Sequence, residues 1–141
     1  MELEVEYLYD QIEKGYEVRK GHNGDAGWDV PMYKTITIVP GKNIIPLGFK
    51  LIPPLFTMGI LSLRSSWMCE GIGCQMVPFD ADFSAEWNLC VYNNTDKDIT
   101  IKEGERICQI VIMPVIPVSL VSKGNLTRPI RGAKGLGSTG K

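Results

Sequence analysis

Residues 86–92 read Glu-Trp-Asn-Leu-Cys-Val-Tyr, and large apolar side chains alternate with smaller or polar ones throughout the stretch. This period of two is typical of a β-strand with one buried face, because successive side chains of a strand point to opposite sides. We therefore expect Trp87, Leu89 and Val91 to point into a core. The Asn-Asn-Thr-Asp sequence at residues 93–96 should turn the chain.

The same alternation recurs on both sides of this strand. Residues 2–9 alternate glutamate with apolar side chains, residues 35–39 read Thr-Ile-Thr-Ile-Val, and residues 59–64 place Leu61 and Leu63 on one face. Turn sequences separate the runs at intervals of about 8–12 residues. A helical period is almost absent, apart from a short turn at residues 10–16 that Gly15 should limit. The pattern predicts an all-β sandwich, barrel or jelly roll.

Proline interrupts two of the apolar runs. Pro46 and Gly48 break residues 44–52, and Pro114 and Pro117 punctuate the β-branched run of residues 106–121. Proline cannot donate a backbone hydrogen bond, so it is rarely found in a central strand. We therefore expect residues 106–121 to form two segments with edges or bends.

Composition narrows the class of protein. A chain of 141 residues suits one domain, and its net charge of −1 argues against a general nucleic-acid binder. There is no apolar run long enough to span a membrane, and the acidic N-terminus is unlike a signal peptide. We expect a cytoplasmic protein. The cysteines form no C-x-x-C pair, which favours reduced thiols over zinc or disulfides; they are Cys69, Cys74, Cys90 and Cys108.

The last fourteen residues differ from the rest. Residues 128–141 are rich in glycine, small polar residues and cations, and should form a mobile arm beside a domain at residues 1–127. They match the pattern G-x-x-x-x-G-K formally, but no Ser/Thr and no helix follow. Glycine backbone and hydroxyl groups still suit phosphate, and Arg131 can bind it bidentately. The alternative is a solvated terminus.

Two carboxylates stand close together at Asp80 and Asp82, within the run Val-Pro-Phe-Asp-Ala-Asp-Phe at residues 77–83. If the run is a strand, both carboxylates share a face; otherwise it is a polar hairpin tip. Either one could act as a base on water or hold a hard cation through water, as could Asp25 and Asp29. The single histidine, His22, lies in a Gly/Asn loop, where we expect it to be solvated.

Five segments in order resemble the motifs of the trimeric dUTP pyrophosphatases (dUTPases), a family that includes phage- and prophage-type members. The third segment departs from the family pattern G-V-I-D-x-D-Y at several positions. The segments are Asp-Ala-Gly-Trp-Asp-Val (residues 25–30), Arg-Ser-Ser (64–66), Phe-Asp-Ala-Asp-Phe (79–83), Gly-Glu-Arg-Ile-Cys-Gln-Ile-Val (104–111) and Arg-Gly-Ala-Lys-Gly-Leu-Gly-Ser-Thr-Gly (131–140).

The resemblance implies a jelly-roll homotrimer of the β-clip type, with active sites at subunit interfaces and the C-terminal arm closing over them. It implies hydrolysis of dUTP to dUMP and pyrophosphate with Mg²⁺. Asp80 would be the general base that activates water for attack on the α-phosphorus. The metal would be held mainly by substrate phosphates, with Asp29 contributing through water.

The resemblance also implies substrate contacts. The phosphates should contact Arg64, Ser65, Ser66 and Gln109, and the γ-phosphate should also contact Arg131, Gly137, Ser138 and Thr139. The uracil should contact Cys74, Gln75 and Phe79 and be covered by Leu136. The deoxyribose should contact Phe83.

Some positions depart from the family pattern. Pro78 removes a backbone donor in the segment that should read uracil. Phe83 replaces a tyrosine, Leu136 an arm phenylalanine, Ala85 a glycine and Lys134 a common glycine.

Two alternatives to this function differ from it in chemistry. A related dCTP deaminase needs an Arg a few residues after Arg-Ser-Ser and a Glu ten residues after the third-motif Asp, where this chain has Cys69 and Cys90. The other is a nucleotide-binding trimer that regulates a protein partner, either without catalysis or beside it.

Overall fold

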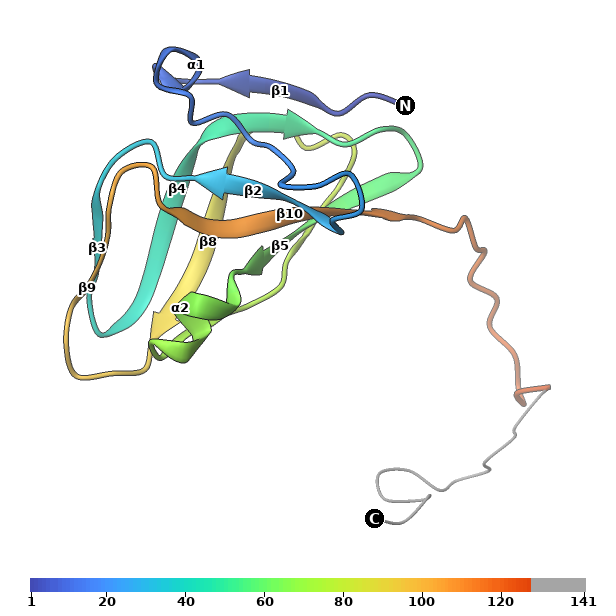
Figure 1. Cartoon of the computed structure of the whole chain (residues 1–141). Coiled ribbons are helices and arrows are strands. Elements are labelled where there is room, and N and C mark those ends of the chain that lie inside the picture. Colours follow the sequence, from blue (N-terminus) through green and yellow to red (C-terminus); the bar gives the residue numbers. More distant parts are fainter. Residues whose placement is uncertain (128–141) are drawn as a thin grey trace.

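The computed structural model describes residues 1–127. These residues form two four-stranded sheets, a two-stranded ribbon and two short helices (Figure 1). The elements are β1 (Glu4–Tyr7), α1 (Gln11–Lys14), β2 (Gly27–Pro31), β3 (Ile36–Ile38), β4 (Gly41–Ile52), β5 (Thr57–Leu63), α2 (Ser65–Cys69), β6 (Ile72–Cys74), β7 (Pro78–Phe79), β8 (Glu86–Asn93), β9 (Ile99–Ile101) and β10 (Arg106–Pro114).

The first sheet has the order β1-β4-β8-β6, the second β2-β10-β5-β7, and β3 pairs with β9. All of these pairings are antiparallel. Side chains of both sheets form one apolar core that runs from Val30 to Ile110. The all-β prediction is confirmed, and the arrangement is the predicted jelly roll.

β8 has the predicted alternation. Trp87, Leu89 and Val91 are at most 1% exposed, and the residues between them face outward. Antiparallel pairing with β4 places Leu89 opposite Ile45. Because β8 lies between β4 and β6 in its sheet, its buried face forms the centre of that half of the core.

Proline interrupts the strands less than predicted. β4 continues through Pro46, and its pairing with β8 becomes irregular only between Pro46 and Lys50. Gly48 within this interval has a φ of 79°, which only glycine adopts easily. The predicted division of residues 106–121 occurs at Pro114, but only the first of the two segments is a strand. β10 is one strand between β2 and β5, it ends at Pro114, and residues 115–127 form no helix or strand.

The run at residues 77–83 is not one strand, so the hypothesis of a shared strand face for the two aspartates is wrong. Only Pro78 and Phe79 are paired, with β5. The chain then turns, and the Phe83 N–H donates to the Asp80 carbonyl at 3.1 Å. A second difference is α2, a helix at Ser65–Cys69, because the sequence shows a helical period only at residues 10–16.

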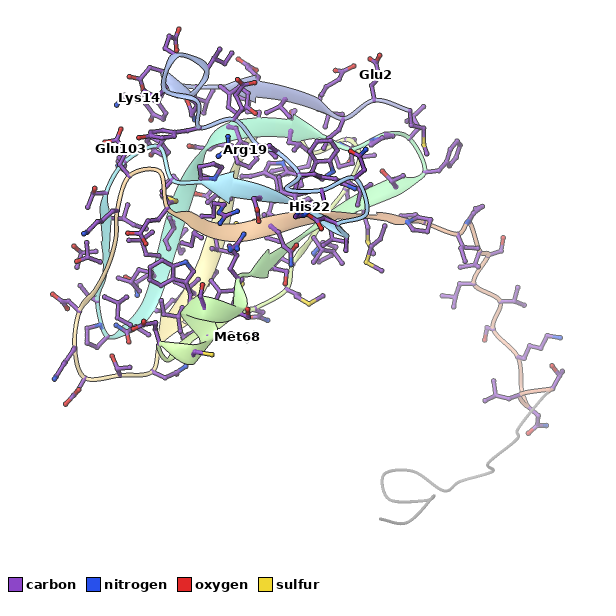
Figure 2. The ribbon with its side chains drawn as sticks, in the orientation of Figure 1. Glu2, Lys14, Arg19, His22, Met68 and Glu103 are labelled. Carbon is purple, nitrogen blue, oxygen red and sulfur yellow. The ribbon has the colours of Figure 1, made fainter. Side chains whose placement is uncertain are left out.

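The N-terminal part is tied to the sheets by polar contacts. Lys14 of α1 and Glu103 of the β9–β10 turn point toward each other, with 2.6 Å between Nζ and Oε1 (Figure 2). α1 ends at Gly15 with a φ of 71°, as predicted. The side chain of Gln11 is buried and donates to the Gly48 carbonyl at 2.7 Å.

The four cysteines are free thiols. Neither helix in residues 1–127 is long and apolar enough to cross a membrane. The predictions for the C-terminal arm lie outside the described residues; they concern Arg131, Leu136, Gly137, Ser138 and Thr139.

Gly59 of β5 lies directly against the ring of Trp87. We therefore expect Gly59→Ala to lower the free energy of unfolding by about 1–3 kcal/mol, because overpacking strains a filled core. A Cβ at Gly59 would lie 2.4 Å from the Trp87 ring. Urea unfolding followed by circular dichroism measures the change. Gly24→Ala is the control, because a Cβ there meets nothing within 4 Å. Equal stability of the two variants would contradict the assigned packing.

Candidate functional site

An apolar pocket of about 310 Å³ lies beside β8. It takes in the aspartate of the third motif and the aromatic residues around it. Its lining residues are Leu61, Gln75, Val77, Pro78, Phe79, Asp80, Phe83, Glu86, Asn88, Leu89 and Cys90.

The apolar pocket exists because the chain changes sheets between β6 and β7. β6 pairs with the end of β8 at Val91–Asn93, whereas β7 pairs with β5. The backbone of β8 at residues 86–90 therefore has no strand partner on that side in the described part of the chain. Backbone N–H and C=O groups at such an edge are ready to bind a polar, planar ligand.

The rim of the apolar pocket carries the proposed base. Phe79 is 9% exposed, and Asp80 follows it directly as an exposed residue in the turn. The Phe83 ring packs edge-on against Phe79, with 5.5 Å between centroids. Asp82 does not line the pocket. Of the two carboxylates, only Asp80 therefore lies at this pocket.

A polar pocket of about 400 Å³ is built by β2, β10 and the junction of β5 with α2. Antiparallel pairing places Gln109 of β10 beside Asp29 of β2. Its lining residues are Gly21, His22, Asp25, Ala26, Gly27, Asp29, Arg64, Ser65, Arg106 and Gln109.

Asp29 holds two arginines in the polar pocket. Its Oδ1 accepts from Nη1 of Arg64, and its Oδ2 accepts from Nη1 of Arg106 at 3.0 Å. The Asp29 side chain is 16% exposed. Each guanidinium has five N–H donors, so both keep donors for an anion. The carboxylate therefore holds two cations side by side in this pocket, and both can still bind an anion.

Gly27 makes room for Gln109. A Cβ at Gly27 would lie 2.5 Å from the Gln109 Oε1 and 3.0 Å from the Ile110 carbonyl oxygen. A larger residue at this place in the first motif would therefore displace Gln109. On the loop that borders the polar pocket, Asp25 Oδ2 accepts from the His22 N–H at 2.8 Å. The imidazole is 89% exposed, as predicted.

No cluster of three or more His, Cys, Asp or Glu side chains in residues 1–127 could hold a metal ion. Asp29 is the predicted metal contact, and both of its oxygens accept from arginine. Each carboxylate oxygen has a further lone pair, so the residue can still contact a hydrated Mg²⁺ through water. This contact stays a prediction.

The structure gathers most of the predicted site residues of the described chain into the two pockets. Asp29, Arg64, Ser65 and Gln109 line the polar one, and Gln75, Phe79, Asp80 and Phe83 line the apolar one. Ser66 lines a neighbouring cavity beside Arg64, and Cys74 is half-buried outside both pockets. Arg131, Leu136, Gly137, Ser138 and Thr139 lie outside the described residues.

Sequence reasoning missed several lining residues. Three of them, Glu86, Asn88 and Cys90, lie at the outward positions of strand β8. The alternation of apolar and polar residues in this strand could have identified these positions as accessible to a ligand. Arg106 lies within the fourth motif, but no role was assigned to it. The two pockets share no lining residue.

Comparison with known proteins agrees with this geometry. The dUTPase family profile matches residues 15–140. The deoxyuridine 5'-triphosphate nucleotidohydrolase of Corynebacterium glutamicum is 36% identical over 128 residues, 87% of this chain and 86% of its own length.

Solved structures are similar across the fold. The dUTPase of Staphylococcus bacteriophage 80alpha with dUpNHpp has a TM-score of 0.86 at 22% identity, covering 99% of both chains. An Asp-to-Asn mutant of the dUTPase of the S. aureus phage phi11, whose structure reveals the coordination of a structural Mg(II) ion, has a TM-score of 0.80 at 19% identity, covering 91% of this chain and 100% of that one. The chain is therefore a member of the dUTPase family and has the fold of the family's phage members.

Proposed function

We propose that this dUTPase hydrolyses dUTP to dUMP and pyrophosphate by binding the nucleoside in the apolar pocket and the triphosphate in a polar one, with Asp80 as the general base. The observation that carries the proposal is the place of Asp80. It is an exposed carboxylate at the rim of the apolar pocket, anchored by a buried aromatic neighbour. A base at that point can reach water beside the first phosphate of a bound nucleotide.

The apolar pocket suits uracil and deoxyribose. The free backbone edge at residues 86–90 offers donors and acceptors for a pyrimidine, and apolar side chains surround the rest of the ring. Phe83 presents a ring that would contact the sugar. A 2′-hydroxyl against that ring would lose its hydrogen bonds to water, which disfavours UTP.

The polar pocket suits a triphosphate. Arg64 and Arg106 supply positive charge, and Ser65 and Gln109 supply neutral donors. Phosphoryl transfer requires mainly positioning and charge neutralisation from the protein. Asp80 takes the proton of the attacking water, while the arginines stabilise the charge that develops on the phosphate oxygens.

Mg²⁺ enters, in this proposal, with the triphosphate. When bound, the ion neutralises phosphate charge and orients the triphosphate for attack by water. Asp29 would contact it through water, as well as holding the arginines. The structural Mg(II) ion of the phage phi11 relative supports an ion in the assembly, without fixing its place in this chain.

A homotrimer with sites between subunits explains why the two pockets share no residue. One dUTP would bind the apolar pocket of one copy and the polar pocket of another, while residues 128–141 of a copy close the site. A regulatory protein partner and a cytoplasmic location stay predictions.

Asp80→Asn should lower kcat for pyrophosphate release by about 10²–10⁴-fold, the usual contribution of a general base. Binding of dUpNHpp should change little, because the amide keeps the shape of the side chain. Pyrophosphate release and calorimetric titration measure the two effects. Asp82→Asn is the matched control and should keep its activity. Equal turnover of Asp80→Asn and the wild type would rule out Asp80 as the base.

Truncation after Thr127 should leave the fold intact, because the core lies between Val30 and Ile110. Activity should fall at least about tenfold, since hydrogen bonds to charged groups contribute about 1.5–3 kcal/mol each. Thermal unfolding and pyrophosphate release with Mg²⁺ measure the two outcomes. Loss of the fold, or full activity, would contradict the assignment of residues 128–141 as an arm over the site.

A further inference from the structure

We propose that Phe79 and Trp87 are positioning residues for substrate selection: a stack of rings reaches from the core to Phe83 and holds it against the sugar. This inference rests on the proposed function, because it assigns Phe83 to the deoxyribose. It adds Trp87 to the site and gives Phe79, beside its predicted contact with uracil, a second role; both residues act through Phe83 and do not touch the reacting atoms.

The stack begins at a side chain with no freedom to move. Trp87 is 0% exposed, and its indole N–H donates to the Leu51 carbonyl at 3.0 Å. On the opposite sheet, Gly59 leaves no gap, since a Cβ there would lie 2.4 Å from the ring. A ring that is held by a hydrogen bond on one edge and packed against backbone on another has little room to rotate or slide.

Phe79 takes its position from Trp87. The two rings are stacked, with centroids 3.9 Å apart and planes 9° from parallel. β7 has only two paired residues, Pro78 and Phe79, and Pro78 has no N–H to donate. Few backbone hydrogen bonds therefore hold this segment. The ring stack supplies the main anchorage for the chain just before Asp80.

Phe83 in turn rests on Phe79. Its ring meets Phe79 edge-on, with 5.5 Å between centroids and 66° between planes. Phe83 itself is 36% exposed, so the side of its ring that faces the pocket is open to a ligand. Phe79 packs against the Phe83 ring on the side of the core. Phenylalanine has no hydroxyl group that could fix the ring by a hydrogen bond. Its orientation toward the sugar therefore depends on the aromatic contact beneath it.

A plain core role for Phe79 makes a different prediction. Truncation of a core ring lowers stability but treats all nucleotides alike, whereas loss of a support under Phe83 acts on the sugar. Phe49 provides the matched control. It also contacts Trp87, with 6.1 Å between centroids, is 1% exposed and does not line the apolar pocket.

The test compares Phe79→Leu with Phe49→Leu. For each variant, we measure kcat/KM for dUTP and UTP with Mg²⁺, dissociation constants for dUpNHpp and its ribose analogue, and the midpoint of thermal unfolding. In Phe79→Leu the preference for deoxyribose should fall about 2- to 10-fold, the range that corresponds to one aromatic pair. In Phe49→Leu the preference should stay at the wild-type value, although both variants unfold at lower temperature.

A double variant tests the route of the effect. In a Phe83→Leu background, Phe79→Leu should lower the deoxyribose preference no further, because its effect passes through Phe83. If Phe79→Leu does not fold, Phe79→Met keeps the volume of the side chain and removes the ring. An equal preference in the Phe79 variant and the Phe49 variant would overturn the inference.

The inference and the proposed function can fail separately. A wild type without dUTP turnover would overturn the proposed function. The dissociation constants would still decide on Phe79, because they need no turnover: an unchanged ratio between the two analogues in the Phe79 variant overturns its role, and a lowered ratio supports it.

Discussion

The contact between the Trp87 indole and Gly59 is the constraint on which the rest of the structure depends. Trp87 belongs to β8 of one sheet and Gly59 to β5 of the other, so their contact sets the distance between the sheets. The same indole stacks on Phe79 and thereby fixes where β7 lies. Because β7 pairs with β5 and not with β8, the apolar pocket opens beside β8. One packing contact therefore links the spacing of the two sheets to the position of the apolar pocket.

The sequence correctly predicted the strands that depend only on the pattern of neighbouring residues. It failed for segments whose structure depends on which strand they pair with. The alternation around Trp87 identifies β8 correctly, because a period of two depends only on neighbouring residues. The Asp80 segment has a similar alternation, yet it turns because only Pro78 and Phe79 find a partner strand. Pro46 was expected to break a strand, but the pairing of β4 with β8 becomes irregular beyond it and the strand continues.

The candidate site divides in the same way. Short motifs singled out Arg64 and Gln109, because phosphate chemistry restricts those residue types, and both line the polar pocket. The same motifs did not indicate that Arg106 is bound to Asp29, a pair that forms because β2 and β10 lie side by side. Asn88 faces outward on any alternating strand. Only the departure of the chain from β8 toward β5 turns that outward face into a pocket wall.

An aspartate inside the proposed phosphate pocket would be electrostatically unfavourable for the substrate, so its presence needs a physical reason. Without Asp29, the two adjacent guanidinium groups would repel each other and move apart. Each substrate molecule would then have to bring them together again when it binds. Asp29 removes part of the attraction for phosphate, but it fixes both arginines before the substrate arrives. In a reaction that depends on positioned charge, donors that are already in place avoid the free-energy cost of reorganisation. The aromatic stack under Phe83 follows the same principle with apolar groups: both pockets are ordered before the nucleotide binds.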